Sequence, residues 1–239
     1  GQCISHDKHG TPVIIEWQKT TLFSPEFATA MRQVWPLACQ AYTSVEMQFL
    51  QTYPEVVGTE NYFKPFEPLF KNGLDTVDWG KAEEVMRTVL KSHFIFDAST
   101  LSAEIVTQYA KDACYVVMLK DQQSNAVLGF ITFIARANYA QGDIKVMSLA
   151  VDQIHQKRGL GKLLMSSILK ISPGIKRIFL CTRVTNETAN KAYQAWGFTK
   201  DENPIMDHAF NLDHWIFLEY KINRADLLQE IAKSLIAIR

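Results

Sequence analysis

The fold of this chain is decided by one short stretch, Gln156-Lys157-Arg158-Gly159-Leu160-Gly161-Lys162. An apolar run precedes it at residues 146–151, and a segment with an apolar stripe follows at residues 160–170. This order predicts a strand, a glycine-rich turn and the start of a helix. The first N–H groups of a helix are unpaired and carry the positive end of its dipole. We therefore expect the turn to bind a phosphate or a pyrophosphate.

The composition of the turn supports an anionic ligand. Glycines let an anion approach the backbone closely, and Lys157, Arg158 and Lys162 add positive charge. The pattern is Q-x-x-G-x-G, which is neither the G-x-G-x-x-G nor the G-x-x-x-x-G-K-[ST] phosphate motif. By itself the pattern fits a tight turn beside a solvated helix face equally well, so it needs a second signal.

A second block supplies that signal. Residues 177–182 predict a buried strand, and residues 186–198 read N-x-x-A-x-x-A-Y-x-x-x-G-F. The latter pattern indicates a short helix that ends at Gly197. The order of strand, Q-x-x-G-x-G turn, helix, strand and second pattern resembles the GCN5-related N-acetyltransferase (GNAT) superfamily over residues 113–220.

The resemblance implies a fold and a site. The implied fold is α/β, with a mixed, mostly antiparallel central sheet flanked by helices. The implied donor is acetyl-CoA, whose pantetheine arm pairs with the strand before the turn and whose pyrophosphate lies on the turn. Tyr193 matches the general acid that protonates the departing thiolate. The implied cofactor-binding residues are Leu149, Val151, Gln156, Lys157, Arg158, Gly159, Leu160, Gly161, Lys162 and Asn186.

Acyl transfer to an amine also needs an oxyanion donor and a route for the amine proton. A backbone N–H of the strand before the turn, expected at Val151, would stabilise the oxyanion. The general base stays open, because this strand carries no inward glutamate and a water chain would also serve. Asp143 fits a turn residue and His155 a surface residue more simply, while Ser148 could anchor a water that carries the proton away. The other candidates are His208 and His214, near the last strand.

The composition excludes several classes of protein. The 239 residues are 47% hydrophobic, and 25 Lys and Arg balance 25 Asp and Glu. A zero net charge argues against bulk nucleic-acid binding, so the cations of the turn fit one small anion better. The four cysteines have no metal-ligand spacing, and we expect no metal. We expect no membrane span, a cytoplasmic location, and a monomer or a homodimer.

The chain is expected to form a single domain over residues 1–239. Its parts are a helical N-terminal elaboration at about 20–112, the best-matched core at 113–220, and a C-terminal helix at 224–238. Ser24 and Pro25 predict the N-cap and first position of a long helix, and residues 53–73 are irregular and aromatic. Further helices are expected at residues 78–91 and 99–112, and strands at residues 13–17, 114–119, 127–136, 145–151, 177–182 and 215–220.

The leading functional hypothesis is an N-acetyltransferase that acts on a primary amine of a small molecule or a peptide. The alternatives are a sensor that binds acyl-CoA without turnover and a partner-binding module on the same fold. The first residues, Gly1-Gln2-Cys3, fit a myristoylation motif if a methionine has been removed. A trimmed terminus explains them equally simply, and we favour it.

Overall fold

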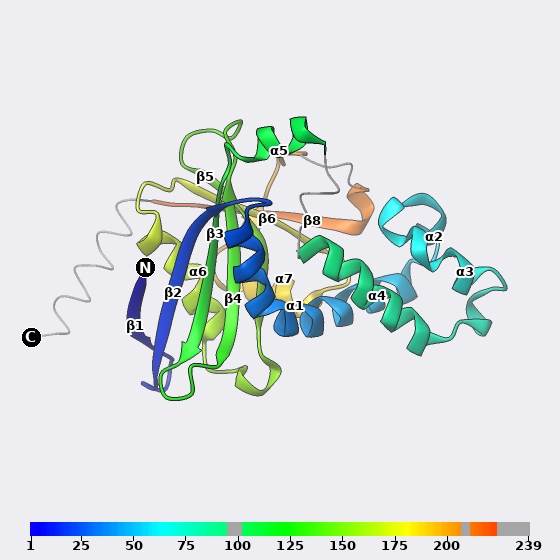
Figure 1. Ribbon diagram of the computed structural model, residues 1–239, viewed down its shortest axis with the longest axis horizontal. Helices are drawn as coiled ribbons and strands as arrows, with labels where there is room; N and C mark the ends of the chain where they lie inside the picture. Colours follow the sequence, from blue (N-terminus) through cyan, green and yellow to red (C-terminus); the bar gives the residue numbers. More distant parts are fainter. Residues whose placement is uncertain (95–101, 207–210, 224–239) are drawn as a thin grey trace, which may run out of the picture.

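The computed structural model describes residues 1–94, 102–206 and 211–223. Its centre is an eight-stranded sheet in the order β1-β2-β3-β4-β5-β6-β8-β7 (Figure 1). Neighbouring strands are antiparallel except for β5 and β6, which are parallel. The predicted mixed, mostly antiparallel sheet flanked by helices is therefore confirmed. The strands are β1 (Gln2–His6), β2 (Pro12–Thr21), β3 (Ala113–Asp121), β4 (Val127–Ala135), β5 (Asp143–Val151), β6 (Arg177–Arg183), β7 (Thr199–Lys200) and β8 (Trp215–Lys221).

Helices cover both faces of the sheet. On one face lies α1 (Pro25–Thr52), whose buried side chains pack on β3 and β4. On the other lie α6 (Leu160–Ile171) and α7 (Glu187–Ala195), which supply the second core cluster. The start of α1 follows the sequence prediction, since Ser24 Oγ accepts a hydrogen bond from Phe27 N–H at 3.1 Å and Pro25 opens the helix.

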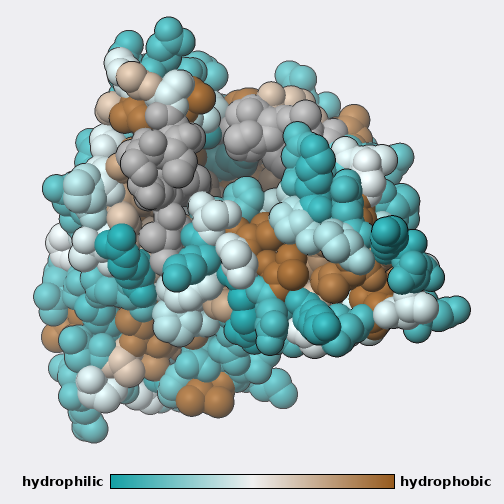
Figure 2. Space-filling view, turned by 45° about the vertical axis from the view of Figure 1, so that its right-hand side comes forward, coloured by the Kyte–Doolittle hydropathy of each residue, from teal (hydrophilic) through white to brown (hydrophobic). Residues whose placement is uncertain are grey.

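A third apolar cluster lies in a helical extension beside the sheet (Figure 1). Its elements are α2 (Val56–Thr59), η1 (Asn61–Phe66), α3 (Glu67–Phe70), η2 (Leu74–Thr76) and α4 (Trp79–Phe94). The aromatic segment at residues 53–73, expected to be irregular, forms the short helices and buries Phe63 and Phe66 against Phe49 of α1. In Figure 2 this part comes forward, and apolar residues show between polar ones on its surface.

Some elements differ from the expectations or lie outside the described residues. Strand β1 was not predicted, because its alternate residues are exposed and its sequence is polar. The helix expected at residues 99–112 is described only as α5 (Ala103–Tyr109), with Ser102 as its N-cap. The expected C-terminal helix at residues 224–238 lies outside the described residues.

The sheet divides between its two parallel strands. Within the described residues, β5 and β6 pair at three positions only, the last joining Lys145 to Phe179. Beyond that point β5 continues along β4 and β6 along β8. A register shift between β4 and β5 leaves Met147 as a bulge at the start of the divergence, and bulges bend and twist a strand. The strands therefore separate into a gap.

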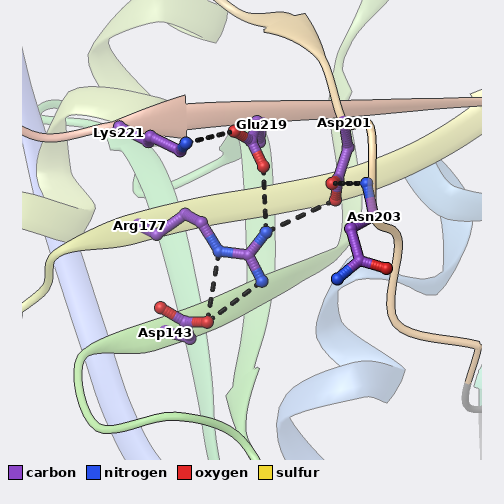
Figure 3. A network of polar contacts seen from close by, with 6 residues as sticks. All are labelled: Asp143, Arg177, Asp201, Asn203, Glu219 and Lys221. Carbon is purple, nitrogen blue, oxygen red and sulfur yellow. Dashed lines mark hydrogen bonds and ion pairs between the residues drawn. The ribbon is translucent and has the colours of Figure 1, made fainter.

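The closed end of β5 and β6 is held by Arg177 (Figure 3). Its guanidinium donates from Nε and Nη2 to Asp143 Oδ2 at 3.1 and 3.0 Å. Its Nη1 reaches Asp201 Oδ2 at 3.4 Å and Glu219 Oε2 at 3.0 Å. One side chain thus joins β5, β6, β8 and the segment after β7.

No helix among the described residues is both long enough and apolar enough to span a bilayer.

Candidate active site between β5 and β6

A cavity of about 670 Å³ fills the gap. One wall is residues 146–151 of β5 and another is residues 180–183 of β6. Helix α1 contributes Tyr42 and Glu46, α7 contributes Tyr193, and the helical extension contributes Glu60 and Tyr62. The cavity therefore brings together chain segments that are far apart in sequence.

The backbone of β5 turns groups that β4 does not pair toward this cavity. Asp152 N–H donates to Leu128 O on β4 at 2.8 Å. Hydrogen-bonded and non-hydrogen-bonded positions alternate along an antiparallel pair. Leu149 and Val151 face Ile131 and Gly129 at the non-hydrogen-bonded positions. Their N–H and C=O groups therefore point away from β4 and into the gap.

The turn after β5 has the shape of an anion site. Lys157 (φ 64°) and Gly159 (φ 75°) are both left-handed, and Gly159 precedes the first residue of α6. No described side chain caps this helix, so its first N–H groups keep their positive potential. Gln156, which also lines the cavity, joins the turn to the gap.

Two residues of the turn serve packing. The side chain of Leu160 lies in the core, so only its backbone can face a ligand. A Cβ on Gly161 would lie 3.2 Å from Trp196 of the α7 region. The absent side chain at Gly161 is therefore explained by close packing of α6 on Trp196, a reason that sequence reasoning had not given.

Arg158 is already paired. Its Nε donates to Asp7 Oδ2 at 2.7 Å, and its Nη1 lies 3.1 Å from His155 Nδ1. The Arg158 hydrogen bond, reinforced by the backbone N–H groups of Thr11 and His9, lowers the pKa of Asp7 to about 2. Because Asp7 offsets the charge of Arg158, the exposed cations of the turn are Lys157 and Lys162.

Helix α7 places the two remaining predicted residues. Asn186 is its N-cap, with Oδ1 accepting from Ala189 N–H at 3.4 Å, and it also lines the cavity. Tyr193 is 9% exposed and lines the same cavity. Burial, with the nearby Cys181 thiol, raises the pKa of Tyr193 well above its usual range. Its hydroxyl therefore stays protonated at neutral pH and can donate.

Sequence reasoning missed the contribution of α1. Tyr42 and Glu46 are one helical turn apart and both reach the cavity. Glu46 accepts from Arg183 Nε at 3.1 Å and from Nη2 at 2.9 Å. The Arg183 guanidinium lies 3.9 Å from the ring centres of Phe49 and Trp215. The signal was present in the sequence as two polar residues at i and i+4 on a mainly apolar helix face.

A second carboxylate on the cavity wall is Glu60. Its Oε1 lies 3.4 Å from His214 Nδ1, and its side chain is 25% exposed. His214 is buried between the rings of Phe49 and Tyr53. The segment between α2 and η1 thus brings to the cavity a carboxylate with access to solvent.

The side chains considered for the general base are scattered. Asp143 is bound by Arg177 at the closed end, and Ser148 shares a short hydrogen bond with Thr132. His155 lies against Arg158 in the turn, and His208 is outside the described residues. Of the described residues in this set, only Ser148 lines the cavity. The described residues contain no cluster of three or more His, Cys, Asp or Glu arranged for a metal.

Comparison with known families decides the affiliation. Residues 83–198 match the model of the Acetyltransferase (GNAT) family. This region belongs to the GNAT superfamily. The match includes the strands of the gap, the turn and the helix that carries Tyr193. A comparison with curated protein sequences gives no match.

Several solved structures are similar to this chain. PaiA N-acetyltransferase from Thermoplasma acidophilum, in complex with coenzyme A, is 14% identical, with 87% of this chain and 99% of that chain covered and a TM-score of 0.45. An acetyltransferase from Thermus thermophilus is 15% identical, with 86% and 97% covered and a TM-score of 0.44. At identities and TM-scores this low, the likenesses carry no conclusion about ligand or activity.

Proposed function

We propose that this protein is an acyl-CoA-dependent N-acyltransferase, which moves an acetyl or other acyl group from acetyl-CoA to a primary amine of a small molecule or a peptide. The observation that carries the proposal is the gap between β5 and β6. There Leu149 and Val151 turn backbone N–H and C=O groups into one cavity. An open strand edge pairs with an extended, amide-bearing ligand as it pairs with another strand. The pantetheine arm of CoA is such a ligand.

The turn after β5 supports binding of the pyrophosphate. The uncapped N-terminus of α6 and the exposed Lys157 and Lys162 lie directly after the strand that would hold the arm. Backbone N–H groups at a helix start bind phosphate oxygens. The backbone of residues 156–162 is therefore the proposed phosphate site, and Asn186 lines the same cavity as Gln156.

Tyr193 is the proposed acid. As the amine nitrogen bonds to the thioester carbon and the carbon–sulfur bond breaks, the sulfur leaves as a thiolate. The raised pKa of Tyr193 disfavours a lasting phenolate. We therefore expect its hydroxyl to donate to the sulfur and to regain a proton afterwards from water.

Glu60 is the proposed acceptor of the amine proton. Its carboxylate lies on the cavity wall, is partly open to solvent and is oriented by His214. Glu46 is a poorer candidate because Arg183 binds both of its oxygens in a buried pair. Both carboxylate oxygens of Glu46 are therefore already engaged as acceptors, whereas Glu60 is partly open to solvent.

One experiment separates binding from turnover. Thermal unfolding is followed with CoA, acetyl-CoA, desulfo-CoA and ATP, and thiol release is then measured with a panel of amines, aminoglycosides and peptides. A ligand at 100 times its Kd stabilises the folded state by about 2.7 kcal/mol, which raises Tm by several degrees. We expect this from the CoA compounds and much less from ATP. Stabilisation without amine-dependent thiol release would indicate a sensor, and no stabilisation would exclude a CoA site.

The same assay tests Tyr193. We expect Tyr193→Phe to lower kcat by about 10²–10⁴-fold, the usual value of general acid catalysis, with acetyl-CoA affinity near that of the wild type. Tyr115→Phe is the matched control, since Tyr115 stacks on Phe133 away from the cavity. An unchanged kcat in the Tyr193 variant would assign this residue a structural role.

A further inference from the structure

The Tyr42 hydroxyl occupies the open backbone of β5. It accepts a hydrogen bond from Leu149 N–H at 2.8 Å and lies 3.4 Å from Leu149 O, to which it donates. A neighbouring strand would satisfy the same two groups. Tyr42 therefore stands where a ligand paired with β5 would meet Leu149.

The position of Leu149 along the strand identifies which part of acyl-CoA it would meet. Val151 and Leu149 are the two residues of β5 that face the gap at non-hydrogen-bonded positions, and Leu149 lies farther from the turn by about 6.6 Å. An arm that starts at the turn and runs back along β5 passes Val151 first. The thioester, at the far end of the arm, then lies at Leu149. In this arrangement Leu149 N–H would meet the oxyanion, in place of the Val151 N–H expected from the sequence.

We propose that Tyr42 O–H and Leu149 N–H together form the oxyanion hole of the acyl-transfer site, an inference that rests on the proposed function. When the thioester oxygen takes over the Leu149 N–H, the Tyr42 hydroxyl is released from its role as acceptor. It then lies beside that oxygen and donates to it. The carbonyl electron pair moves onto oxygen as the carbon–nitrogen bond forms and returns as the carbon–sulfur bond breaks. Tyr42 keeps its proton throughout.

The surroundings of Tyr42 suit a fixed donor. Burial, with Tyr193 and Glu46 nearby, raises the pKa of Tyr42 well above its usual range, so the phenol stays protonated. The ring packs against Phe94 at 5.1 Å between centres. One turn further along α1, the Glu46–Arg183 pair attaches the helix to β6. Donors that are held in place before the reaction stabilise developing charge most effectively.

The test compares Tyr42→Phe with the wild type in binding, turnover and infrared spectroscopy. Loss of one oxyanion donor lowers kcat by about 10²–10³-fold, and we expect this loss with acetyl-CoA affinity within about threefold of the wild type. With acetyl-CoA labelled by ¹³C at the carbonyl and no amine present, the C=O stretch should fall on binding to the wild type and fall less on binding to the variant. Tyr115→Phe again serves as the control.

A second variant covers the case in which Tyr42→Phe does not fold. Fluorotyrosine at position 42 keeps the shape and makes the phenol a stronger donor, so the C=O stretch should fall further than in the wild type. Equal or faster turnover and tighter binding in Tyr42→Phe would show that Tyr42 only plugs the site, and would overturn the inference. An unchanged C=O stretch with fluorotyrosine would overturn it as well. If the wild type fails to bind CoA, the proposed function itself is wrong.

Discussion

The two ends of the β5–β6 pair satisfy the backbone and the charges of these strands in different ways. At the closed end the strands pair directly, and Arg177 joins three carboxylates around them (Figure 3). At the open end the strands do not pair, and side chains of α1 take the place of the missing strand. Tyr42 there bonds the backbone of β5, while Glu46 holds Arg183 of β6.

This difference shows which backbone groups of the sheet a ligand can bind. A backbone group paired with another strand is not available to a ligand, and a buried unpaired group is costly. At the open end a single hydroxyl, that of Tyr42, satisfies Leu149, and it can exchange this hydrogen bond for one to a ligand without separating two paired strands. The closed end fixes the geometry, and the open end keeps its backbone groups accessible.

The largest expected effect comes from breaking the ion pair at the open end. Glu46→Ala leaves the Arg183 cation buried between Phe49 and Trp215 without its carboxylate. Removing one partner of a buried pair costs about 3–5 kcal/mol of unfolding free energy. Chemical denaturation measures this loss directly.

Two controls sharpen the result for Glu46. Replacing Glu46 and Arg183 together by methionine removes both charges and should restore most of the lost stability. Glu83→Ala breaks an exposed pair with Arg87 on α4 and should change the unfolding free energy by less than about 1 kcal/mol. A Glu46→Ala variant as stable as the wild type would show that the pair does not tie α1 to β6.

A smaller effect is expected at the closed end. Arg177→Leu leaves Asp143, Asp201 and Glu219 close together without their shared cation, at a cost of about 2–3 kcal/mol near pH 7. Burial already raises the pKa of Asp201, and loss of Arg177 raises it further. A carboxyl whose folded pKa is raised favours the folded state at low pH and opposes it as pH rises. The difference in unfolding free energy between Arg177→Leu and the wild type should therefore become smaller as pH falls toward about 4.

The closed-end variant has a matched control in the same network. Lys221 also bonds Glu219, at 3.2 Å, but its side chain is 76% exposed. Lys221→Met should therefore change the unfolding free energy by less than about 1 kcal/mol. A stability difference for Arg177→Leu that grows as pH falls would contradict the role given to the three carboxylates.

The smallest expected effect concerns the proton path at the open end. Glu60→Gln should lower kcat/KM near pH 7 by about tenfold, less than the usual value of a general base because water can also take the proton. A lysine-like amine has a pKa of about 10.4, so a larger fraction of it is already deprotonated as pH rises. The difference in kcat/KM between Glu60→Gln and the wild type should therefore become smaller at higher pH. Glu55→Gln, at an exposed neighbour, is the control. A deficit independent of pH would favour a positioning role for Glu60.

The sequence predicted those helices and strands that have a clear hydrophobic pattern or clear capping residues. The alternation and apolar runs indicated the central strands, and Ser24 with Pro25 indicated the start of α1. The turn after β5 and the helix of Tyr193 were predictable because glycine conformation and helix capping depend on neighbouring residues. The polar edge strand β1 was not predicted, because neither its composition nor its length is typical of a strand.

The sequence, through its family resemblance, therefore predicted the sheet class and the turn, and it offered candidate roles for Leu149, Val151, residues 156–162 and Tyr193. Tertiary structure decided what faces them: Tyr42 on Leu149, Asp7 on Arg158, and Glu60 on the cavity wall. These partners come from segments separated by up to 151 positions in the chain. Local periodicity carries no information about such pairings, because they depend on which helix face meets which strand once the core has packed.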